Sequence, residues 1–395
     1  MSDPWLTIVG LGEDGPAGLS QASRESIARA EAIFGGPRHL ELIGAGARGH
    51  AWPVPFSTAP VLARRGQRVV VLASGDPFWF GAGGSLVRDL RPGEWVCHPA
   101  PSTFSWAAAR LGWRLEETLC LGLHAAPLSR LRPILADGQR LVCLLRDGAA
   151  AVELAAWLAA AGYGDSRLWV LEALGGPRER IRQARAARFG IADIQAPVAM
   201  AIEAEGAPGL PHSSGLPEQL FAHDGQITKR HVRALTVSAL APRPGECLWD
   251  LGAGSGSVSV EWCLAAPQAV AHPVECRKDR VTNISANADA FGLAHRISVH
   301  QGSWPDCLDD LPRPDAVFVG GGLDETAFDR LWAAMPGRAR LVVNTVTLET
   351  ESLIVALHAR LGGSLVRICI EEAAPLGRLR GWVPARPVVQ WSVIK

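Results

Sequence analysis

Residues 248–262 read LWDLGAGSGSVSVEW, an apolar run that enters a loop with glycine at every second position. Glycine permits positive φ and lacks the Cβ that would keep a ligand away from the backbone. The run from Glu246 to Leu251 predicts a buried strand, and a helix is expected to begin at Ser257 and to include Ala265. A helix N-terminus offers free N–H groups and a partial positive charge. The stretch therefore predicts a strand, a ligand-binding turn and a helix.

The same alternation of strands and helices extends on both sides of this loop. Before it, apolar runs such as LTIVG, RVVVLAS and APVAMAI alternate with helical patterns, including residues 19–34 and AVELAAWLAAAG. After it, the runs ECLWDL, AVAHPVE, RISVH, DAVFVGG and ARLVVN restart the pattern. Such alternation predicts an α/β fold with largely parallel sheets. Two last strands, LVRICIE and VVQWSVI, are joined without a helix, which predicts an antiparallel terminal hairpin.

A segment rich in glycine, proline and serine, EGAPGLPHSSGLPEQLFAHDG at residues 205–225, has the composition of a linker. We predict one domain over residues 1–205, a linker over 206–224 and a second domain over 225–395. The two halves share no visible repeat, so two different α/β domains are expected.

Composition argues against several functional classes. The chain has 395 residues, 48% of them hydrophobic, and a formal net charge of zero. The absence of net positive charge gives no support to nucleic acid as a partner, and no apolar run is long enough to predict a membrane span. No signal-peptide pattern appears at the N-terminus, so a cytoplasmic location is expected. The eight cysteines form no CxxC pair, and the histidines have no ligand spacing, so no metal is predicted.

Two features of the second domain favour S-adenosylmethionine over a dinucleotide, namely Asp250 in the glycine loop and the antiparallel terminal hairpin, whereas Glu275 suits both ligands. Asp250 inside the loop would repel a pyrophosphate but suits the ammonium and sulfonium groups of a methionine moiety. Glu275 ends the next predicted strand, where its carboxylate can accept hydrogen bonds from two ribose hydroxyls. No Gly-Lys-Ser/Thr follows the loop, which excludes a P-loop. The predicted contacts of the cofactor are Thr228, Asp250, Gly252, Ala253, Gly254, Ser255, Gly256, Glu275 and, against the adenine, Trp304.

Two other classes remain as alternatives. An NAD-dependent dehydrogenase would use the same loop and the same Glu275. An RNA methyltransferase would need a basic face.

Residues around the loop suggest a substrate site. GQITKRHVRALTVSAL at residues 225–240 predicts an entry helix with basic residues on its first turns, and DAVFVGGG ends a predicted strand in three glycines at the carboxyl edge of the sheet. The predicted substrate-binding residues are Lys229, Arg230, Arg233, Gly320, Gly321 and Gly322. A solvated helix face is the alternative for the three basic residues. No catalytic residue is assigned.

DGQITKRHVRAL, LWDLGAGSGSVSVEW, DAVFVGGG and NTVTLET together resemble the cobalamin-pathway methyltransferases that act on a precorrin macrocycle and decarboxylate it. The resemblance spans nearly the whole second domain. It implies a Rossmann-like class I methyltransferase fold and a tetrapyrrole substrate, and a homo-oligomer is expected.

In the first domain, VGLGEDGPAGLS (residues 9–20), VVVLASGDPFWFGAGGSL, PAPSTFSWAAARLGW and VLEALGGPRERI resemble, in this order, the tetrapyrrole methylase family. That family has a two-lobed α/β fold with S-adenosylmethionine folded between the lobes. The implied cofactor contacts are Leu11, Asp76, Trp79, Thr103 and Phe104. Capping of the following helix is the alternative role for Asp76.

The first-domain sequence departs from the family in its first turn. The family's usual Gly-Pro-Gly is replaced here by Gly12-Glu13-Asp14-Gly15-Pro16. Together the two resemblances imply one S-adenosylmethionine per domain. They also imply methylation of macrocycle carbons 5 and 15 and decarboxylation of the ring C acetate.

Overall fold

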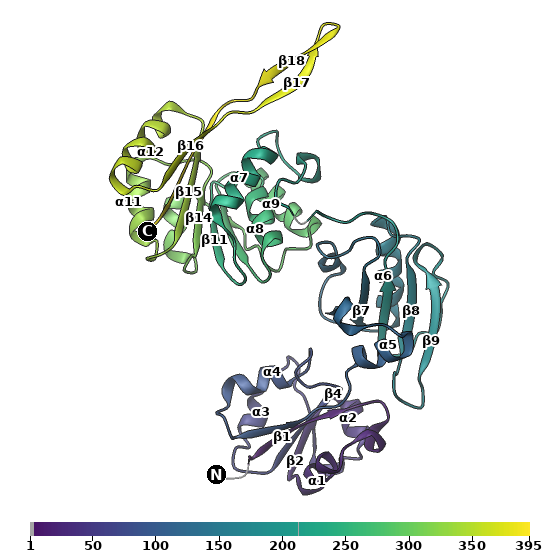
Figure 1. Ribbon diagram of the computed structural model, residues 1–395. Coiled ribbons are helices and arrows are strands. Elements are labelled where there is room, and N and C mark those ends of the chain that lie inside the picture. Colours follow the sequence, from purple (N-terminus) through teal and green to yellow (C-terminus); the bar gives the residue numbers. More distant parts are fainter. Residues whose placement is uncertain (1–3, 212) are drawn as a thin grey trace. The chain divides into compact units, whose positions relative to one another are not determined.

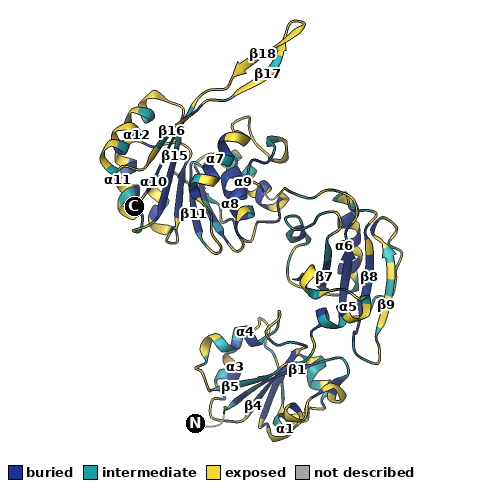
Figure 2. Cartoon of the chain, in the orientation of Figure 1, coloured by how far each residue is buried: buried dark blue, intermediate teal, exposed yellow. Residues whose placement is uncertain are grey.

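The computed structural model describes residues 4–211 and 213–395. The chain forms two compact units. One comprises Met1–Ala126 and Ala136–Pro208, and the other comprises Pro127–Leu135 and Gly209–Lys395. In each unit the buried residues concentrate in the central strands (Figure 2).

The first lobe of the first unit is built on a parallel five-stranded sheet of order β3-β2-β4-β1-β5. Its strands are β1 (Leu6–Leu11), β2 (Ala32–Gly35), β3 (Gly49–Ala51), β4 (Val69–Ser74) and β5 (Trp95–His98). The connecting helices are α1 (Gln21–Arg29), α2 (Pro37–Leu42), α3 (Ala59–Leu62) and α4 (Gly83–Leu86). The central strands β1 and β4 are buried nearly throughout, as expected for a parallel sheet covered on both faces.

The second lobe has a mixed five-stranded sheet of order β6-β7-β10-β8-β9. Only β6 and β7 pair in parallel in it. The strands are β6 (Thr118–Gly122), β7 (Arg140–Leu145), β8 (Arg167–Glu172), β9 (Arg180–Arg185) and β10 (Val198–Glu203), and the helices are α5 (Thr103–Leu111) and α6 (Gly148–Ala160). The predicted two-lobed α/β architecture is confirmed.

The second unit contains a seven-stranded sheet of order β13-β12-β11-β14-β15-β19-β16. The strands are β11 (Cys247–Leu251), β12 (Val270–Glu275), β13 (His300–Gln301), β14 (Ala316–Val319), β15 (Arg340–Thr345), β16 (Ser364–Ile368) and β19 (Val388–Ile394). Strand β19 is antiparallel to both β15 and β16. This order and the antiparallel ending confirm the predicted Rossmann-like methyltransferase fold.

Helices cover both faces of this sheet (Figure 1). The helices are α7 (Arg230–Leu240), α8 (Ser257–Ala265), α9 (Lys278–Ala290), α10 (Trp304–Cys307), α11 (Glu325–Ala334) and α12 (Leu348–Leu361). Helices α7, α8 and α9 supply Leu240, Trp262 and Ile284 to one hydrophobic core. The other core takes Phe328 from α11 and Ile354 from α12.

Three expectations about the elements need correction. The last two strands of the sheet are joined by a further hairpin, β17 (Glu371–Leu376) and β18 (Leu379–Pro384), which projects from the unit (Figure 1). The helix predicted at 19–34 ends earlier, because α1 ends at Arg29 and the residues from Ala32 onward form strand β2. Helix α7 begins at Arg230, so Thr228 and Lys229 precede its first turn.

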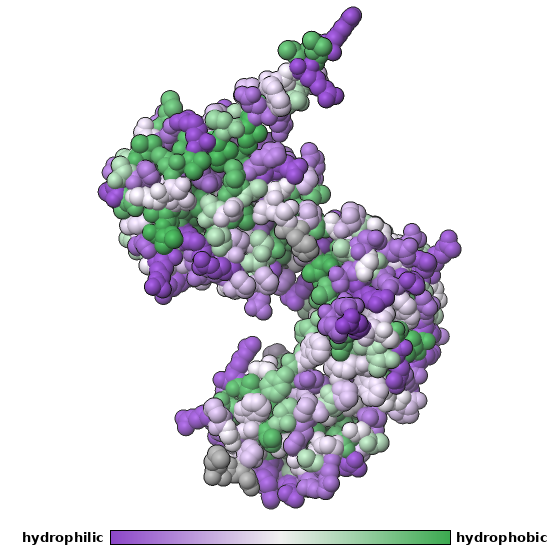
Figure 3. Space-filling model, in the orientation of Figure 1, coloured by the Kyte–Doolittle hydropathy of each residue, from purple (hydrophilic) through white to green (hydrophobic). Residues whose placement is uncertain are grey.

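The projecting hairpin carries hydrophobic residues between hydrophilic ones (Figure 3). Its Trp382 side chain is 71% exposed. In the part of the chain that the structure describes, no helix combines the length and the apolar character needed to cross a membrane.

Candidate active sites

The glycine loop between β11 and α8 has the conformation that its sequence predicts. Gly252, Gly254 and Gly256 all adopt positive φ, at 69°, 60° and 70°. A Cβ at Gly256 would lie 2.8 Å from Cγ2 of Ile284 on α9, so this position has room only for glycine. A Cβ at Gly254 would have no atom within 4 Å, so the loop leaves open space there. The loop thus has the positive φ angles and the open space that its glycines permit, and its contact with a ligand stays a prediction.

Asp250 has a different role from the one predicted. Its side chain is fully buried, and its Oδ2 accepts hydrogen bonds from the Ser259 N–H (3.1 Å) and the Ser259 hydroxyl (2.6 Å). Burial raises the pKa of Asp250 to about 6. The prediction that Asp250 contacts the cofactor is wrong, because no part of its carboxylate reaches the surface. It instead fixes the first turn of α8 beneath the loop.

Glu275 at the end of β12 supports the same loop. Its Oε2 accepts a hydrogen bond from the Gly254 N–H (3.0 Å), and its Oε1 accepts one from the Arg277 N–H (3.0 Å). The residue is 4% exposed. Oε1 also accepts from Cys276 Sγ (3.4 Å), and each carboxylate oxygen has two lone pairs, so one lone pair remains on Oε2 for a further donor. The contact of Glu275 with the ribose stays a prediction.

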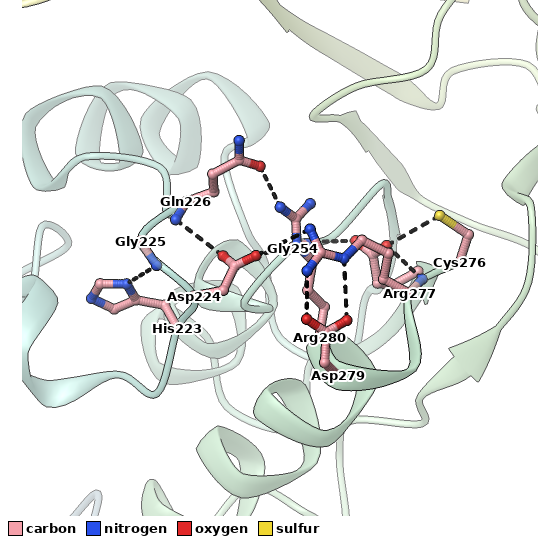
Figure 4. A network of polar contacts seen from close by, with 10 residues as sticks. His223, Asp224, Gly225, Gln226, Gly254, Cys276, Arg277, Asp279 and Arg280 are labelled. Carbon is pink, nitrogen blue, oxygen red and sulfur yellow. Dashed lines mark hydrogen bonds and ion pairs between the residues drawn. The ribbon is translucent and has the colours of Figure 1, made fainter.

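The segment before α7 is tied to the start of α9 (Figure 4). Asp224 accepts hydrogen bonds from the Gln226 N–H (3.0 Å) and from Arg280 Nε (3.0 Å), and it lies 3.3 Å from Arg277 Nη1. The Gln226 N–H and then Arg280 hold the pKa of Asp224 below its usual range. This network holds the chain just before Thr228 against the loop side of the sheet.

A cavity of about 1060 Å³ opens at the carboxyl ends of the strands in the second unit. Most of the residues predicted for cofactor and substrate line it, namely Thr228, Lys229, Arg230, Gly252, Ala253, Gly254, Ser255, Gly320, Gly321 and Gly322. The structure therefore brings together residues from three separate segments. Gly256, next along the loop, meets Ile284 instead of the cavity.

Four other predicted residues are not among those that line this cavity, namely Asp250, Glu275, Trp304 and Arg233. Trp304 packs in the core with Leu308 and Phe328, and its Nε1 donates to the Gly321 carbonyl (3.1 Å). Its predicted contact with adenine has no support in this geometry. Arg233 is 0% exposed, and its guanidinium donates to Glu261 Oε1 (2.6 Å) and to the carbonyls of Thr228 and Leu216. The prediction that Arg233 binds substrate is wrong, because its side chain is fully buried and does not line the cavity.

Sequence analysis missed other residues that line the cavity. Asn344, Thr345 and Thr347 follow or end β15, and Arg386 lies at the base of the projecting hairpin. The motif NTVTLET contains the first three, and the rule that ligands bind at the carboxyl edge could have assigned them. No local signal identifies Arg386, because its place depends on a hairpin that was not predicted.

A second cavity, of about 390 Å³, lies within the first unit. The predicted contacts Leu11, Trp79, Thr103 and Phe104 line it, and the Trp79 and Phe104 rings lie 4.8 Å apart. Asp76 does not line it. Its Oδ1 accepts a hydrogen bond from the Phe78 N–H (2.8 Å), so this side chain stabilises the turn after β4. The predicted cofactor contact of Asp76 is therefore not supported.

Further residues of the first unit line the same cavity without having been predicted. They include Glu13, Arg38, His39 and Ser74. Among the described residues, no three His, Cys, Asp or Glu side chains gather as a metal site requires.

Comparisons with known proteins agree with this architecture. A family model described as the precorrin methyltransferase domain matches residues 219–395, and one for tetrapyrrole (corrin/porphyrin) methylases matches residues 5–189. A "Probable cobalt-precorrin-6B C(15)-methyltransferase (decarboxylating)" from Pyrobaculum calidifontis is 34% identical over 38% of this chain and 78% of its own.

Two relatives match along the whole chain. A "Precorrin-6Y C(5,15)-methyltransferase [decarboxylating]" from Sinorhizobium is 48% identical over 99% of this chain and 97% of its own length. A protein of the same name from Mycobacterium tuberculosis is 38% identical over 99% of this chain and 100% of its own. The chain therefore belongs to the family of decarboxylating precorrin-6Y C(5,15)-methyltransferases.

Proposed function

We propose that the chain methylates carbons 5 and 15 of a precorrin macrocycle and removes carbon dioxide from the ring C acetate, giving precorrin-8X in cobalamin biosynthesis. The observation that carries this proposal is that one chain forms two separate cavities, one in each unit, at the carboxyl ends of parallel strands. Two methyl transfers to distant carbons can then use two separate cofactor sites. The domain bounds 1–205 and 225–395 stay part of this proposal.

The residues present fit S-adenosylmethionine in the second unit. The loop Gly252–Gly256 has three positive φ angles and open space beside Gly254. The Ser255 hydroxyl is buried and has no hydrogen-bond partner among the described residues. When bound, S-adenosylmethionine supplies an electrophilic methyl group on a sulfonium centre. Thr228, the loop and Glu275 would hold it there, and Leu11, Trp79, Thr103 and Phe104 would do so in the first unit.

The protein's contribution to methyl transfer is mainly orientation. A reduced macrocycle is an electron-rich enamine, so its meso carbon can attack the methyl group in line once both are held in contact. Such positioning can lower the activation free energy of methyl transfer by roughly 7–11 kcal/mol. Lys229 and Arg230 line the second cavity, where their cations suit the peripheral carboxylates of the macrocycle.

We assign methylation at carbon 15 and decarboxylation to the second unit, and methylation at carbon 5 to the first. The relative from Pyrobaculum supports pairing the first two steps, because its name combines them and it matches only 38% of this chain. Chemically, methylation at carbon 15 leaves an iminium-like macrocycle. That macrocycle can accept the electron pair of the breaking bond to the carboxylate.

Product mass tests the proposal directly. Full-length protein, incubated with S-adenosylmethionine and a reduced precorrin, should give a product with two added methyl groups and one carbon dioxide fewer. Carbon dioxide release should require S-adenosylmethionine and survive EDTA. Release without S-adenosylmethionine, or its loss with chelator, would contradict the mechanism. Tight binding of NADH without methyl transfer would favour the dehydrogenase alternative.

A homo-oligomeric state and a cytoplasmic location complete the proposal. Light scattering coupled to size-exclusion chromatography tests the first, and cell fractionation tests the second.

A further inference from the structure

A polar cluster whose residues were not predicted for cofactor or substrate lies at the carboxyl edge of the first unit's parallel sheet. Ser74 ends β4, and Arg38 and His39 lie on α2. His39 Nε2 is 2.9 Å from Ser74 Oγ and 3.1 Å from Arg38 Nη2, and Arg38 Nη2 is 3.3 Å from Ser74 Oγ. All three side chains line the cavity of that unit.

The hydrogen bonds of this cluster are incomplete. Arginine can only donate, so His39 Nε2 must accept from Arg38, which leaves the ring proton on Nδ1. Nδ1 is buried and has no partner among the described residues. The other tautomer would direct an N–H at a guanidinium. Either arrangement leaves a polar group unsatisfied, which is uncommon in a site that serves only the fold.

The charges around the cluster are also incomplete. Glu13 forms ion pairs with Arg38 and, at 3.5 Å, with Arg178. Burial, and then the charge of Arg178, lower the pKa of Arg38. Burial and Arg38 lower the pKa of His39 to about 4, so its ring is neutral at pH 7. Two guanidinium groups therefore share one carboxylate.

An exposed apolar rim adjoins the cluster. The turns after β3 and β4 carry Phe56, which packs on Trp52, and Phe80; they are 51% and 52% exposed. Phe80 and Trp52 also line the cavity. A reduced tetrapyrrole is a broad apolar ring with carboxylates at its edge. The rim suits the ring, and the polar cluster suits a carboxylate at the edge.

We propose that Arg38, His39 and Ser74 form a subsite of the first unit that binds one peripheral carboxylate of the macrocycle and so orients it for methylation at carbon 5. Arg38 supplies the cation, Ser74 supplies a hydroxyl, and His39 holds both in place through the contacts of its Nε2. This inference rests on the proposed function. The carboxylate of S-adenosylmethionine has the same chemistry, so the test must separate the two sources.

Arg38→Gln in the full-length protein provides the test. The KM for the precorrin in methylation at carbon 5 should rise roughly tenfold to a hundredfold, because a charge-assisted hydrogen bond is lost. The kcat should change little, and cofactor affinity measured by calorimetry should stay within about twofold, since the lost contact is to the macrocycle. Arg38→Lys should restore only part of the KM, because it keeps the charge but loses the contacts of Nη2 with His39 and Ser74.

The control is Arg29→Gln, on the exposed face of α1, where the side chain forms an ion pair with Glu25. It should leave every parameter unchanged. Ser74→Ala, at an exposed position, provides a second variant if Arg38→Gln fails to fold, and it should raise the KM roughly threefold to tenfold through one lost hydrogen bond.

Three results separate the possible failures. Weaker cofactor binding with an unchanged KM for the precorrin would overturn the inference, because the subsite would then hold the carboxylate of S-adenosylmethionine. No change in either parameter would also overturn it, because the cluster would then be structural. Absence of any methylated product from the wild-type protein would instead contradict the proposed function.

Discussion

Glu261→Gln would break a buried network that holds the entry segment of the second unit. Oε1 of Glu261 accepts hydrogen bonds from the Leu216 N–H (2.8 Å) and Arg233 Nε (2.6 Å), and Oε2 accepts one from the Gly215 N–H (2.7 Å). Arg233 in turn donates to the Thr228 carbonyl. Glutamine keeps the volume but removes the charge and replaces one acceptor with a donor.

The expected cost follows from burial. Both side chains of the pair are at most 1% exposed, so neither Arg233 nor the freed N–H groups can turn to water. Removing one partner of a buried ion pair typically costs 3–5 kcal/mol, and we expect a loss of about 4 kcal/mol here. Because Arg233 also holds Thr228, which lines the cavity, affinity for S-adenosylmethionine in the second unit should fall as well.

Hydrogen exchange followed by mass spectrometry measures the effect where it occurs. Protection of the Gly215 and Leu216 amides should drop, and urea unfolding of the second unit should shift to lower concentration. Arg330→Gln is the matched control, because Arg330 forms an ion pair with Asp306 at the surface, where both side chains are more than 40% exposed. Such pairs contribute about 0–1 kcal/mol.

The double variant Arg233→Met/Glu261→Gln sharpens the test. Replacing an isolated buried pair by apolar groups is often neutral. Here the backbone groups of Gly215, Leu216 and Thr228 would remain unpaired, so the double variant should not recover stability. Wild-type protection at residues 215–216 together with unchanged cofactor affinity in Glu261→Gln would refute the assigned role of the network.

Three further variants probe the glycine loop of the second unit. Glu275→Ala frees the Gly254 N–H and removes the predicted ribose acceptor, so calorimetry should show a loss of about 1–3 kcal/mol in cofactor binding, and an unchanged affinity would contradict the assignment. Gly256→Val places a Cβ 2.8 Å from Ile284 and should abolish binding in the second unit only, whereas Gly84→Ala, with no atom within 4 Å, should have no effect. Asp250 has a folded pKa raised to about 6, so its stabilising contribution is complete below roughly pH 4 and is lost as the pH rises through 6. Asp250→Asn should therefore flatten the decline in the free energy of unfolding over this range, by an amount on the order of 3 kcal/mol, and parallel pH profiles from urea unfolding would exclude this cause.

Local patterns predicted the elements around the glycine loop well. Strand β11 and helix α8 follow the expected segments, and α8 begins at Ser257 as predicted. The hairpin of β17 and β18 was missed because most of its residues are exposed on both faces, so no alternating hydrophobic pattern marks its strands. The sequence around the glycine loop marks β11 and α8 through its own hydrophobic pattern. The exposed hairpin of β17 and β18 leaves no such pattern in the sequence.

Contacts between distant residues account for the errors in the site. Arg233 has the sequence context of a surface residue, and its partner Glu261 lies 28 positions away on another helix. Arg38 meets Glu13 and Arg178, which come from two other segments, in the same way. Neither pairing leaves a recognisable pattern in the sequence around its residues. Sequence analysis could therefore recognise that cations are present near the strand ends but could not separate those that face the cavity from those that hold the fold.

Asp250 in the glycine loop shows that a wrongly predicted contact can leave the functional conclusion intact. Asp250 was expected to exclude pyrophosphate by contact, yet its carboxylate is buried and binds Ser259. With a pKa of about 6 it is ionised at pH 7, and it lies against the first turn of α8. A negative charge there opposes the positive end of the helix dipole, which would otherwise favour an anion. The dielectric constant inside the protein is low, so the charge of Asp250 still affects a ligand on the other side of the loop. Asp250 can thus disfavour a phosphate and favour a sulfonium without touching either.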